Sequence, residues 1–167
     1  MIDIRFERAL EADIPELTSI MKRAFDDDSQ RFLGKPEGGP PGYDDGSFLE
    51  RWGFSEEGGD CYKIILDDSK AIGVFIVFLP RNGKNVLGTI FIDPEFQDRG
   101  IGTQAMQFIF STFPGKTWRL DTPDWTTRNH HFYEKNGFIK IREEWDPHLK
   151  GEEGGAYMYF YEKNMGF

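Results

Sequence analysis

The chain has 167 residues, with 20 Lys and Arg against 29 Asp and Glu, 38% hydrophobic residues, 16% aromatic residues and one cysteine. This composition predicts one soluble globular domain, residues 1–167, and the formal charge of −9 disfavours nucleic acid as a partner. The longest apolar run, Ile72–Leu79, is too short to cross a bilayer, and no secretory pattern opens the chain. We therefore expect a cytoplasmic protein with no membrane partner, no disulfide and no metal site.

The first third of the chain predicts a strand, a helix and a long loop. Alternating apolar residues predict a strand over residues 1–9, and apolar positions spaced by three and four predict a helix from Ala12 to Phe25. Residues 34–46 hold five glycines and three prolines, which predicts a loop, either a binding loop or lid or a disordered segment. Ser47–Phe54 is predicted to form a short helix whose aromatic residues pack against the body of the domain.

This long loop belongs to an acidic, Gly/Pro-rich region, residues 26–60, which we predict to be largely loop. The region has ten acidic residues against three basic residues and so accounts for −7 of the total charge. A concentration of negative charge raises the local concentration of cations. The region therefore favours a small or cationic partner.

The middle of the chain predicts three consecutive strands. Cys61–Leu66, Ile72–Leu79 and Val86–Ile92 are rich in β-branched and aromatic residues, and turn signals at Asp67-Asp68 and Asn82-Gly83 separate them. The second of these strands is almost continuously apolar, which is typical of a strand covered on both faces. Helices are therefore expected on each side of the sheet.

The C-terminal part alternates between helices and strands. Helices are predicted over Ile101–Phe113 and Thr126–Asn136, and strands over Trp118–Asp121, Ile139–Trp145 and Ala156–Glu162. No internal repeat is visible. The order of the elements predicts a mixed α/β sandwich.

The segment Thr89–Thr103 carries the clearest chemical signal. A strand ends at Asp93-Pro94, and a short turn leads through Gly100 and Gly102 into a helix. The first amides of a helix lack intrahelical acceptors and carry partial positive charge, so this turn suits an anion. Glycines let a phosphate approach the backbone, although the same pattern also occurs where elements merely pack tightly.

This segment resembles a motif of the GNAT superfamily of N-acetyltransferases. Gln97–Gly102 resembles the family sequence Q/R-x-x-G-x-G/A at the same strand-to-helix junction, and Ile92–Phe96 and Phe132–Phe138 are similar to neighbouring family elements in the same order. The resemblance covers the whole chain in element order and residues 86–142 in motif. It implies a GNAT-like α/β fold, with a mixed, mostly antiparallel central sheet of about seven strands and helices on both faces.

The resemblance also implies a binding site for acetyl-CoA as co-substrate. Main-chain groups of Ile90, Phe91 and Ile92 would bind the pantetheine arm and the acetyl carbonyl, as if the arm were an added strand. Backbone amides would hold the pyrophosphate, and these belong to Asp98, Arg99, Gly100, Ile101, Gly102 and Thr103. The side chain of Arg99 either adds charge near a phosphate or lies in solvent.

One position departs from the family pattern. An asparagine that commonly contacts the cofactor is replaced here by Thr126. The threonine hydroxyl would take its place, or Asn129, one turn further on, would do so. The adjacent His130 and His131 point to different faces of the helix, which favours packing or surface roles.

Two residues are candidates for catalysis. Tyr133 aligns with the family tyrosine that protonates the leaving thiolate; the alternative is an aromatic side chain that only packs against the sheet. Asp121 is our first choice for the base, acting through water, because it lies where some members carry a catalytic glutamate; the alternative is a carboxylate that caps a turn. Asp93 is a further candidate base, or a residue that shapes the turn before Pro94.

We therefore expect an acetyl-CoA-dependent N-acetyltransferase that works by direct attack in a ternary complex. The acceptor is predicted to be a primary amine of a cationic small molecule or peptide, concentrated by the acidic region 26–60. The alternative function is a CoA or acyl-CoA sensor that transfers nothing. Because domains of this family often dimerise, a homodimer is one expected state.

Overall fold

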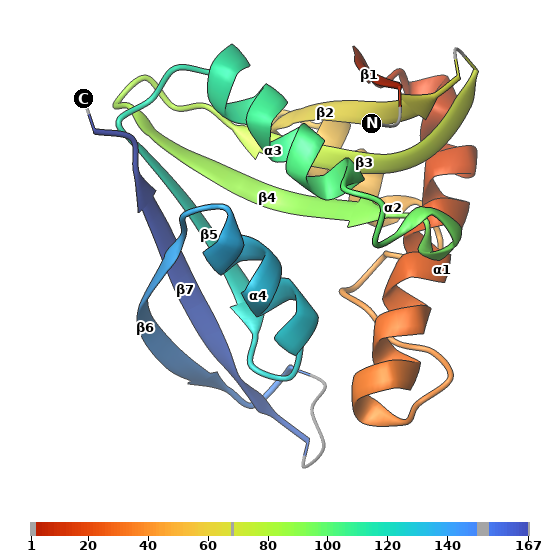
Figure 1. Cartoon of the computed structure of the whole chain (residues 1–167). Coiled ribbons are helices and arrows are strands. Elements are labelled where there is room, and N and C mark those ends of the chain that lie inside the picture. The colour runs from red at the N-terminus through yellow and green to blue at the C-terminus, as the bar shows by residue number, and fades with distance from the viewer. Residues whose placement is uncertain (1–2, 68, 150–153, 167) are drawn as a thin grey trace.

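A computed structural model describes residues 3–67, 69–149 and 154–166, so Met1, Ile2 and Asp68 of the predicted strand and turn lie outside the described residues. Seven strands form one sheet in the order β1-β2-β3-β4-β5-β7-β6 (Figure 1). Neighbouring strands are antiparallel except for the parallel pair β4 and β5, which confirms the predicted fold class. The strands are β1 Ile4–Arg8, β2 Asp60–Leu66, β3 Lys70–Phe78, β4 Lys84–Ile92, β5 Thr117–Pro123, β6 Ile139–Asp146 and β7 Ala156–Asn164.

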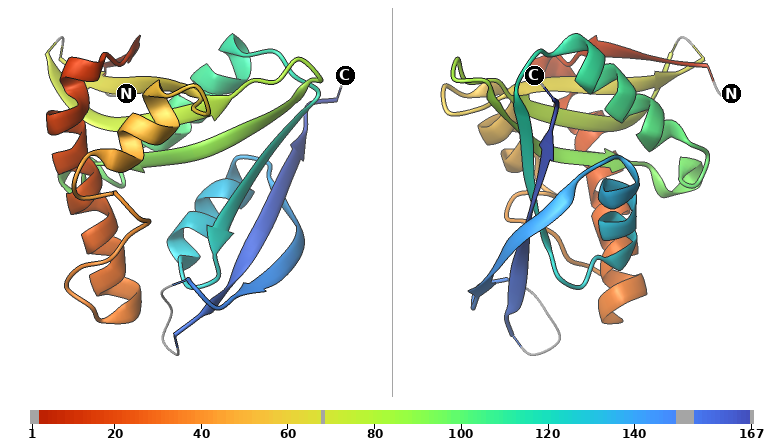
Figure 2. Two further views of the ribbon diagram at one scale, coloured as in Figure 1. Left: turned by 180° about the vertical axis from the view of Figure 1, so that it is seen from behind. Right: turned by 60° about the vertical axis from the view of Figure 1, so that its left-hand side comes forward.

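Helices cover both faces of this sheet, as Figures 1 and 2 show. One core layer lies between the sheet and α1 and α2 and includes Leu17, Leu49 and Val74. The other lies under α3 and α4 and includes Met106 and Trp118. The helices are α1 Ile14–Leu33, α2 Ser47–Leu49, α3 Ile101–Thr112 and α4 Thr127–Lys135, with a π-helical turn at Glu50–Phe54 and 3-10 turns at Glu11–Asp13 and Pro94–Phe96.

The first helix is longer than its apolar periodicity predicts. It continues past Phe25 to Leu33, so residues 26–33 of the region that we predicted as loop are helical. Pairs of opposite charge four residues apart support this extension, since Lys22 lies 2.6 Å from Asp26 and Arg31 lies 2.9 Å from Asp27. Gly34 ends the helix with a φ of 67°, a conformation that glycine adopts at low cost.

The Gly/Pro-rich loop that follows is held against α1 by one carboxylate. Asp26 accepts hydrogen bonds from the Tyr43 hydroxyl at 2.6 Å and from the Gly38 amide at 3.1 Å. The Ser29 hydroxyl donates to the Glu37 carbonyl at 3.2 Å. These hydrogen bonds hold residues 34–46 along α1.

The parallel pair β4 and β5 parts soon after it begins. Only Lys84 to Val86 of β4 pair with Thr117 to Arg119 of β5. Beyond this point the two strands diverge, and Figure 1 shows them spreading from a common end near the C-terminus. The remainder of β4 therefore has a β3 neighbour on one side and an opening on the other.

Candidate active site

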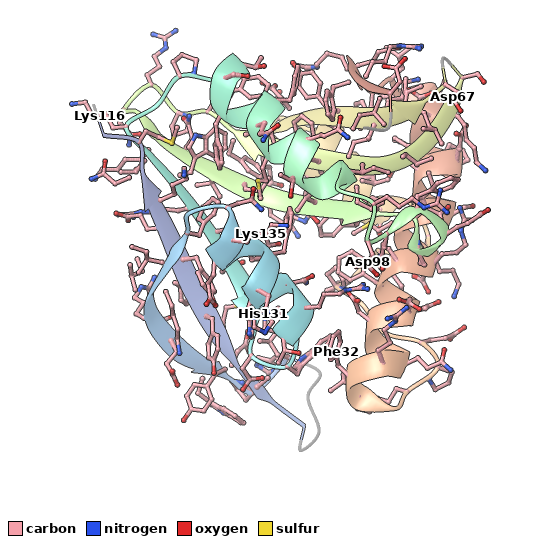
Figure 3. The ribbon with its side chains drawn as sticks, viewed as in Figure 1. Phe32, Asp67, Asp98, Lys116, His131 and Lys135 are labelled. Carbon is pink, nitrogen blue, oxygen red and sulfur yellow. The ribbon has the colours of Figure 1, made fainter. Side chains whose placement is uncertain are left out.

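A cavity of about 420 Å³ lies where β4 and β5 part. Its walls come from α1, the end of β4, the turn before α3, the first turn of α3, and α4. In Figure 3, Asp98 marks the turn and Lys135 marks the last turn of α4. The lining includes Tyr133 and nine of the predicted cofactor residues, namely Ile90, Phe91, Ile92, Asp98, Gly100, Ile101, Gly102, Thr103 and Asn129.

The turn that enters α3 presents backbone to this cavity. Asp98 and Gly100 have positive φ values of 62° and 79°, and successive amides in such turns form concave anion sites. No atom lies within 4 Å of the place that a Cβ of Gly100 would occupy. The first-turn amides of α3 have no acceptor within the helix. Together these features make a cradle that fits a phosphate.

The neighbouring residue Arg99 lies elsewhere. Its side chain is exposed and its guanidinium stands 5.4 Å from the ring centre of Phe96, and it does not line the cavity. Of the two alternatives for this residue, the structure therefore favours the one in solvent.

Gln97 ties this turn to the end of β4. Its Nε2 donates to the carbonyl of Ile92 at 3.0 Å, whereas its buried Oε1 has no described hydrogen-bond partner. The Asp93 amide donates to β3, at the carbonyl of Ile72. Because main-chain groups alternate along a strand, those of Ile90 and Ile92 face the opening and those of Phe91 face β3. Two of the three predicted main-chain contacts therefore face the cavity.

Gly102 lets α3 approach α4 closely. A Cβ at this position would lie 2.9 Å from Cε1 of Phe132, which is too close for an unstrained contact. Phe132 itself lines the cavity. The second glycine of the motif is thus explained by packing, and the first by the open cradle.

Tyr133 is buried where this cavity meets the core. Its ring packs near Phe138 and Tyr161, and no described side chain hydrogen-bonds its hydroxyl. Burial raises the pKa of Tyr133 well above its usual range, and the charges of Asp28 and Asp121 raise it further. The phenol therefore keeps its proton at neutral pH, as a general acid must.

Among the lining residues that the sequence analysis did not predict is a pair of opposite charge. Asp28 on α1 lies 3.1 Å from Nη2 of Arg128 on α4, and both residues line the cavity. Burial raises the pKa of Asp28, against the opposing charge of Arg128. No local motif marks this pair, because one hundred residues separate its members.

Asp121 does not line the cavity. The side chains of Trp118, Leu120 and Thr122 on β5 are buried, and Asp121 alternates with them on the other face of the sheet. Partial desolvation raises its pKa, and Arg142 opposes this effect. The carboxylate is close enough to Tyr133 for its charge to act on the phenol.

Other predicted residues have structural partners. The buried Thr126 bonds Thr122 and the Pro123 carbonyl, both at 2.9 Å, and lies outside the cavity lining. His130 bonds the same carbonyl at 2.8 Å, which agrees with its predicted packing role. The Asp93 carboxylate accepts hydrogen bonds from Arg23 at 2.7 Å and from the amide of Glu95. These bonds shape the turn that follows β4.

The acidic region does not surround the cavity. Of its ten acidic residues, only Asp28 lines the cavity wall. Others hold basic groups or backbone amides elsewhere, as Asp26, Asp45 and Asp60 do. At the cavity itself, the prediction that this region concentrates a cationic acceptor therefore has only Asp28 to support it.

Comparisons with known proteins agree with this geometry. Residues 17–138 match the model of the acetyltransferase (GNAT) family. The chain belongs to this family. A relative from Bacillus subtilis (strain 168), the uncharacterized protein YrkN, is 27% identical over 143 residues, which cover 85% of this chain and 76% of YrkN.

Solved GNAT structures share the fold at low identity. The ribosomal-protein-S18-alanine N-acetyltransferase of Escherichia coli superimposes with a TM-score of 0.76 at 14% identity, covering 99% of this chain and 96% of its own. A Bacillus subtilis acetyltransferase in complex with CoA has a TM-score of 0.64 at 16% identity, covering 99% of each chain. These likenesses establish the fold.

The described residues contain neither a candidate membrane span nor a candidate metal site. No described helix combines the length and apolarity that a membrane span needs. Across residues 3–67, 69–149 and 154–166, no cluster of three or more His, Cys, Asp or Glu side chains is arranged to bind a metal ion.

Proposed function

We propose that this GNAT protein transfers an acetyl group from acetyl-CoA to a primary amine by direct attack in a ternary complex. One observation carries the proposal: a single cavity is lined by the free edge of β4, the first turn of α3 and Tyr133. These parts match the three sections of acetyl-CoA, which are a pantetheine arm with amides, a pyrophosphate and a thioester.

The cradle at the start of α3 would hold the pyrophosphate through backbone amides. Lys135, which also lines the cavity, would add positive charge. Along β4, the main-chain groups of Ile90 and Ile92 that face the opening would pair with the pantetheine arm. The carbonyl of Ile92 already accepts from Gln97, so the free Oε1 of Gln97 is the acceptor that we propose for an amide of the arm.

The transfer needs one acid and one base. The amine nitrogen attacks the carbonyl carbon of the thioester, a C–N bond forms, and the C–S bond breaks. Tyr133 gives its proton to the departing thiolate, and a carboxylate takes a proton from the nitrogen. The tyrosine regains its proton from solvent before the next turnover.

Asp28 and Asp121 are the two carboxylates that we propose for the base. Desolvation raises the pKa of both, which makes each a better proton acceptor than an ordinary aspartate. Asp28 lines the cavity and would act directly. Asp121 would act through water from the other face of the sheet. We assign the leading role to Asp28, because it lines the same cavity as Tyr133 and Asp121 does not.

Two measurements test the function. Calorimetry with CoA tests binding, and free thiol released from acetyl-CoA across a broad panel of amines tests transfer. We expect binding together with amine-dependent thiol release. Tight CoA binding without any thiol release across the panel would instead indicate a CoA sensor, and absence of CoA binding would refute both functions.

A further inference from the structure

Two of the residues that line the cavity form an ion pair between two helices. Nη2 of Arg128 on α4 lies 3.1 Å from Oδ1 of Asp28 and 3.9 Å from Oδ2 of Asp27, both on α1. Side-chain exposure is only 28% for Arg128 and 16% for Asp28. The pair joins helices from the two opposite layers at the opening between β4 and β5.

The guanidinium of Arg128 is only partly satisfied. Its Nη1 is buried and has no hydrogen-bond partner among the described residues. A guanidinium carries five N–H donors in a fixed fork, and a buried charged donor without an acceptor is costly. Because Arg128 lines the cavity, an anionic group placed there would complete its hydrogen bonds.

The charged residues that line the cavity balance one another. Asp28 and Arg128 supply one negative and one positive charge, while the other charged lining residues, Asp98 and Lys135, belong to the turn before α3 and the last turn of α4. At this pair a polycation would meet one carboxylate and, beside it, the cationic Arg128, which repels its remaining charges. A molecule with one ammonium and one carboxylate would match both partners.

We propose that Asp28 and Arg128 select an acceptor that is a small zwitterion, of the free α-amino-acid class. The amine meets Asp28, and the carboxylate accepts from the Nη1 side of Arg128. Phe25 and Phe91, whose ring centres lie 6.2 Å apart in the cavity wall, would contact an apolar side chain. This inference rests on the proposed function, and it replaces the cationic acceptor predicted from net charge.

The test compares acceptors that differ only at the carboxylate. Pools of L-amino acids first identify the best acceptor, and its carboxamide and its decarboxylated amine complete the matched set. We expect the amino acid to exceed both analogues at least about tenfold in kcat/KM. Arg128→Gln should raise KM for the amino acid about 10- to 100-fold, the loss typical of a hydrogen bond between charged groups, and bring the ratio of the KM values for carboxamide and amino acid close to one.

Matched variants separate recognition from folding. Arg31→Gln removes a cation that pairs with Asp27 and does not line the cavity, so it should leave the preference intact. Arg128→Lys keeps the charge but loses the fork, and we expect an intermediate preference. Thermal unfolding and the Kd for CoA, measured on each variant, identify any general damage to the fold.

The outcomes separate this inference from the proposed function. Acetylation of amines with no advantage for the amino acid, or an advantage that survives Arg128→Gln, refutes the zwitterion inference and leaves the transferase standing. Calorimetry of the amino acid with the CoA-loaded protein gives a readout independent of turnover. If the amino acid binds the wild-type protein and Arg128→Gln abolishes this binding, the inference is supported even where no acetyl group is transferred.

Discussion

Removal of the Tyr133 hydroxyl is the most direct test of the transfer chemistry at a single residue. Tyr133→Phe keeps the ring that packs near Phe138 and Tyr161 and removes only the acid. We expect turnover to fall by about 10²-fold, within the range for loss of a general acid, while the Kd for CoA changes little. Thiol-release kinetics and calorimetry measure the two quantities. An unchanged kcat would remove Tyr133 from the mechanism.

The base is tested by the pH dependence of kcat/KM. A base acts when it is deprotonated, so activity should fall as the pH drops through the raised pKa of Asp28. Asp28→Asn should lower kcat/KM by about 10²-fold and abolish this acid limb, whereas Asp27→Asn, its neighbour outside the cavity lining, should preserve it. An acid limb that persists in Asp28→Asn and disappears in Asp121→Asn would move the role to Asp121.

Residues with a local signature were easier to predict than residues brought together by the fold. Gly100 belongs to a motif whose geometry follows from a strand, a turn and a helix. In the structure Gly100 lines the cavity. Asp28 and Arg128 carry no such signature. Their contact depends on the length of α1 beyond Phe25, and the apolar spacing of the sequence does not extend that far.

At the scale of elements, Asp26 determines how the Gly/Pro-rich loop lies on α1. Burial opposes its ionisation, but hydrogen bonds from Lys22, Tyr43 and the Gly38 amide outweigh this and lower the pKa of the carboxyl. Asp26→Asn should reduce the free energy of unfolding by about 1–3 kcal/mol. Urea denaturation measures the change, and Asp44→Asn, at an exposed loop position, is the control.

The sign of the pH effect follows from that lowered pKa. The stabilising contribution of Asp26 is present above the ordinary aspartate value of 3.8 and is lost as the pH falls through the lower pKa of the folded state. The difference in unfolding free energy between wild type and Asp26→Asn should therefore shrink in strong acid. A difference that stays constant down to pH values well below 3.8 would contradict this account.

The turn into α3 gives a second element-level prediction. Gly100→Ala adds a Cβ to a residue with a φ of 79°, which costs about 1–2 kcal/mol, and the new atom points into open space within the cradle. We expect the Kd for CoA to rise about tenfold or more, with a smaller loss of stability. Gly154→Ala, also at positive φ with open space, is the control. Equal Kd values for both variants would contradict the cradle.

Most elements could be predicted from the sequence because their periodicity is clear and their boundaries carry turn residues. The end of α1 could not, since its last turns are polar and are supported by charge pairs and by the loop that packs against them. Thr126 shows the converse limit. Its hydroxyl is one of two predicted substitutes for the family asparagine, the other being Asn129, and in the structure it bonds to Thr122 and to the Pro123 carbonyl.

At the scale of the whole molecule, the fold class followed from the order of elements and from the family resemblance. The spatial order of the strands did not follow from periodicity alone, since β7 inserts between β5 and β6. Periodicity did not predict which residues surround the cavity either. A net charge of −9 says little about a site in which one acidic residue of region 26–60 takes part.

The early parting of β4 and β5 gives the sheet an edge in its interior as well as two at its margins. Deuterium should reach the Ile90 and Ile92 amides quickly in the free protein, while the Phe91 amide, directed to β3, stays protected. Bound CoA should slow hydrogen exchange at the Ile90 and Ile92 amides and leave exchange at the Phe91 amide unchanged. Such a pattern would mean that the protein folds with one strand missing and that its substrate completes the sheet.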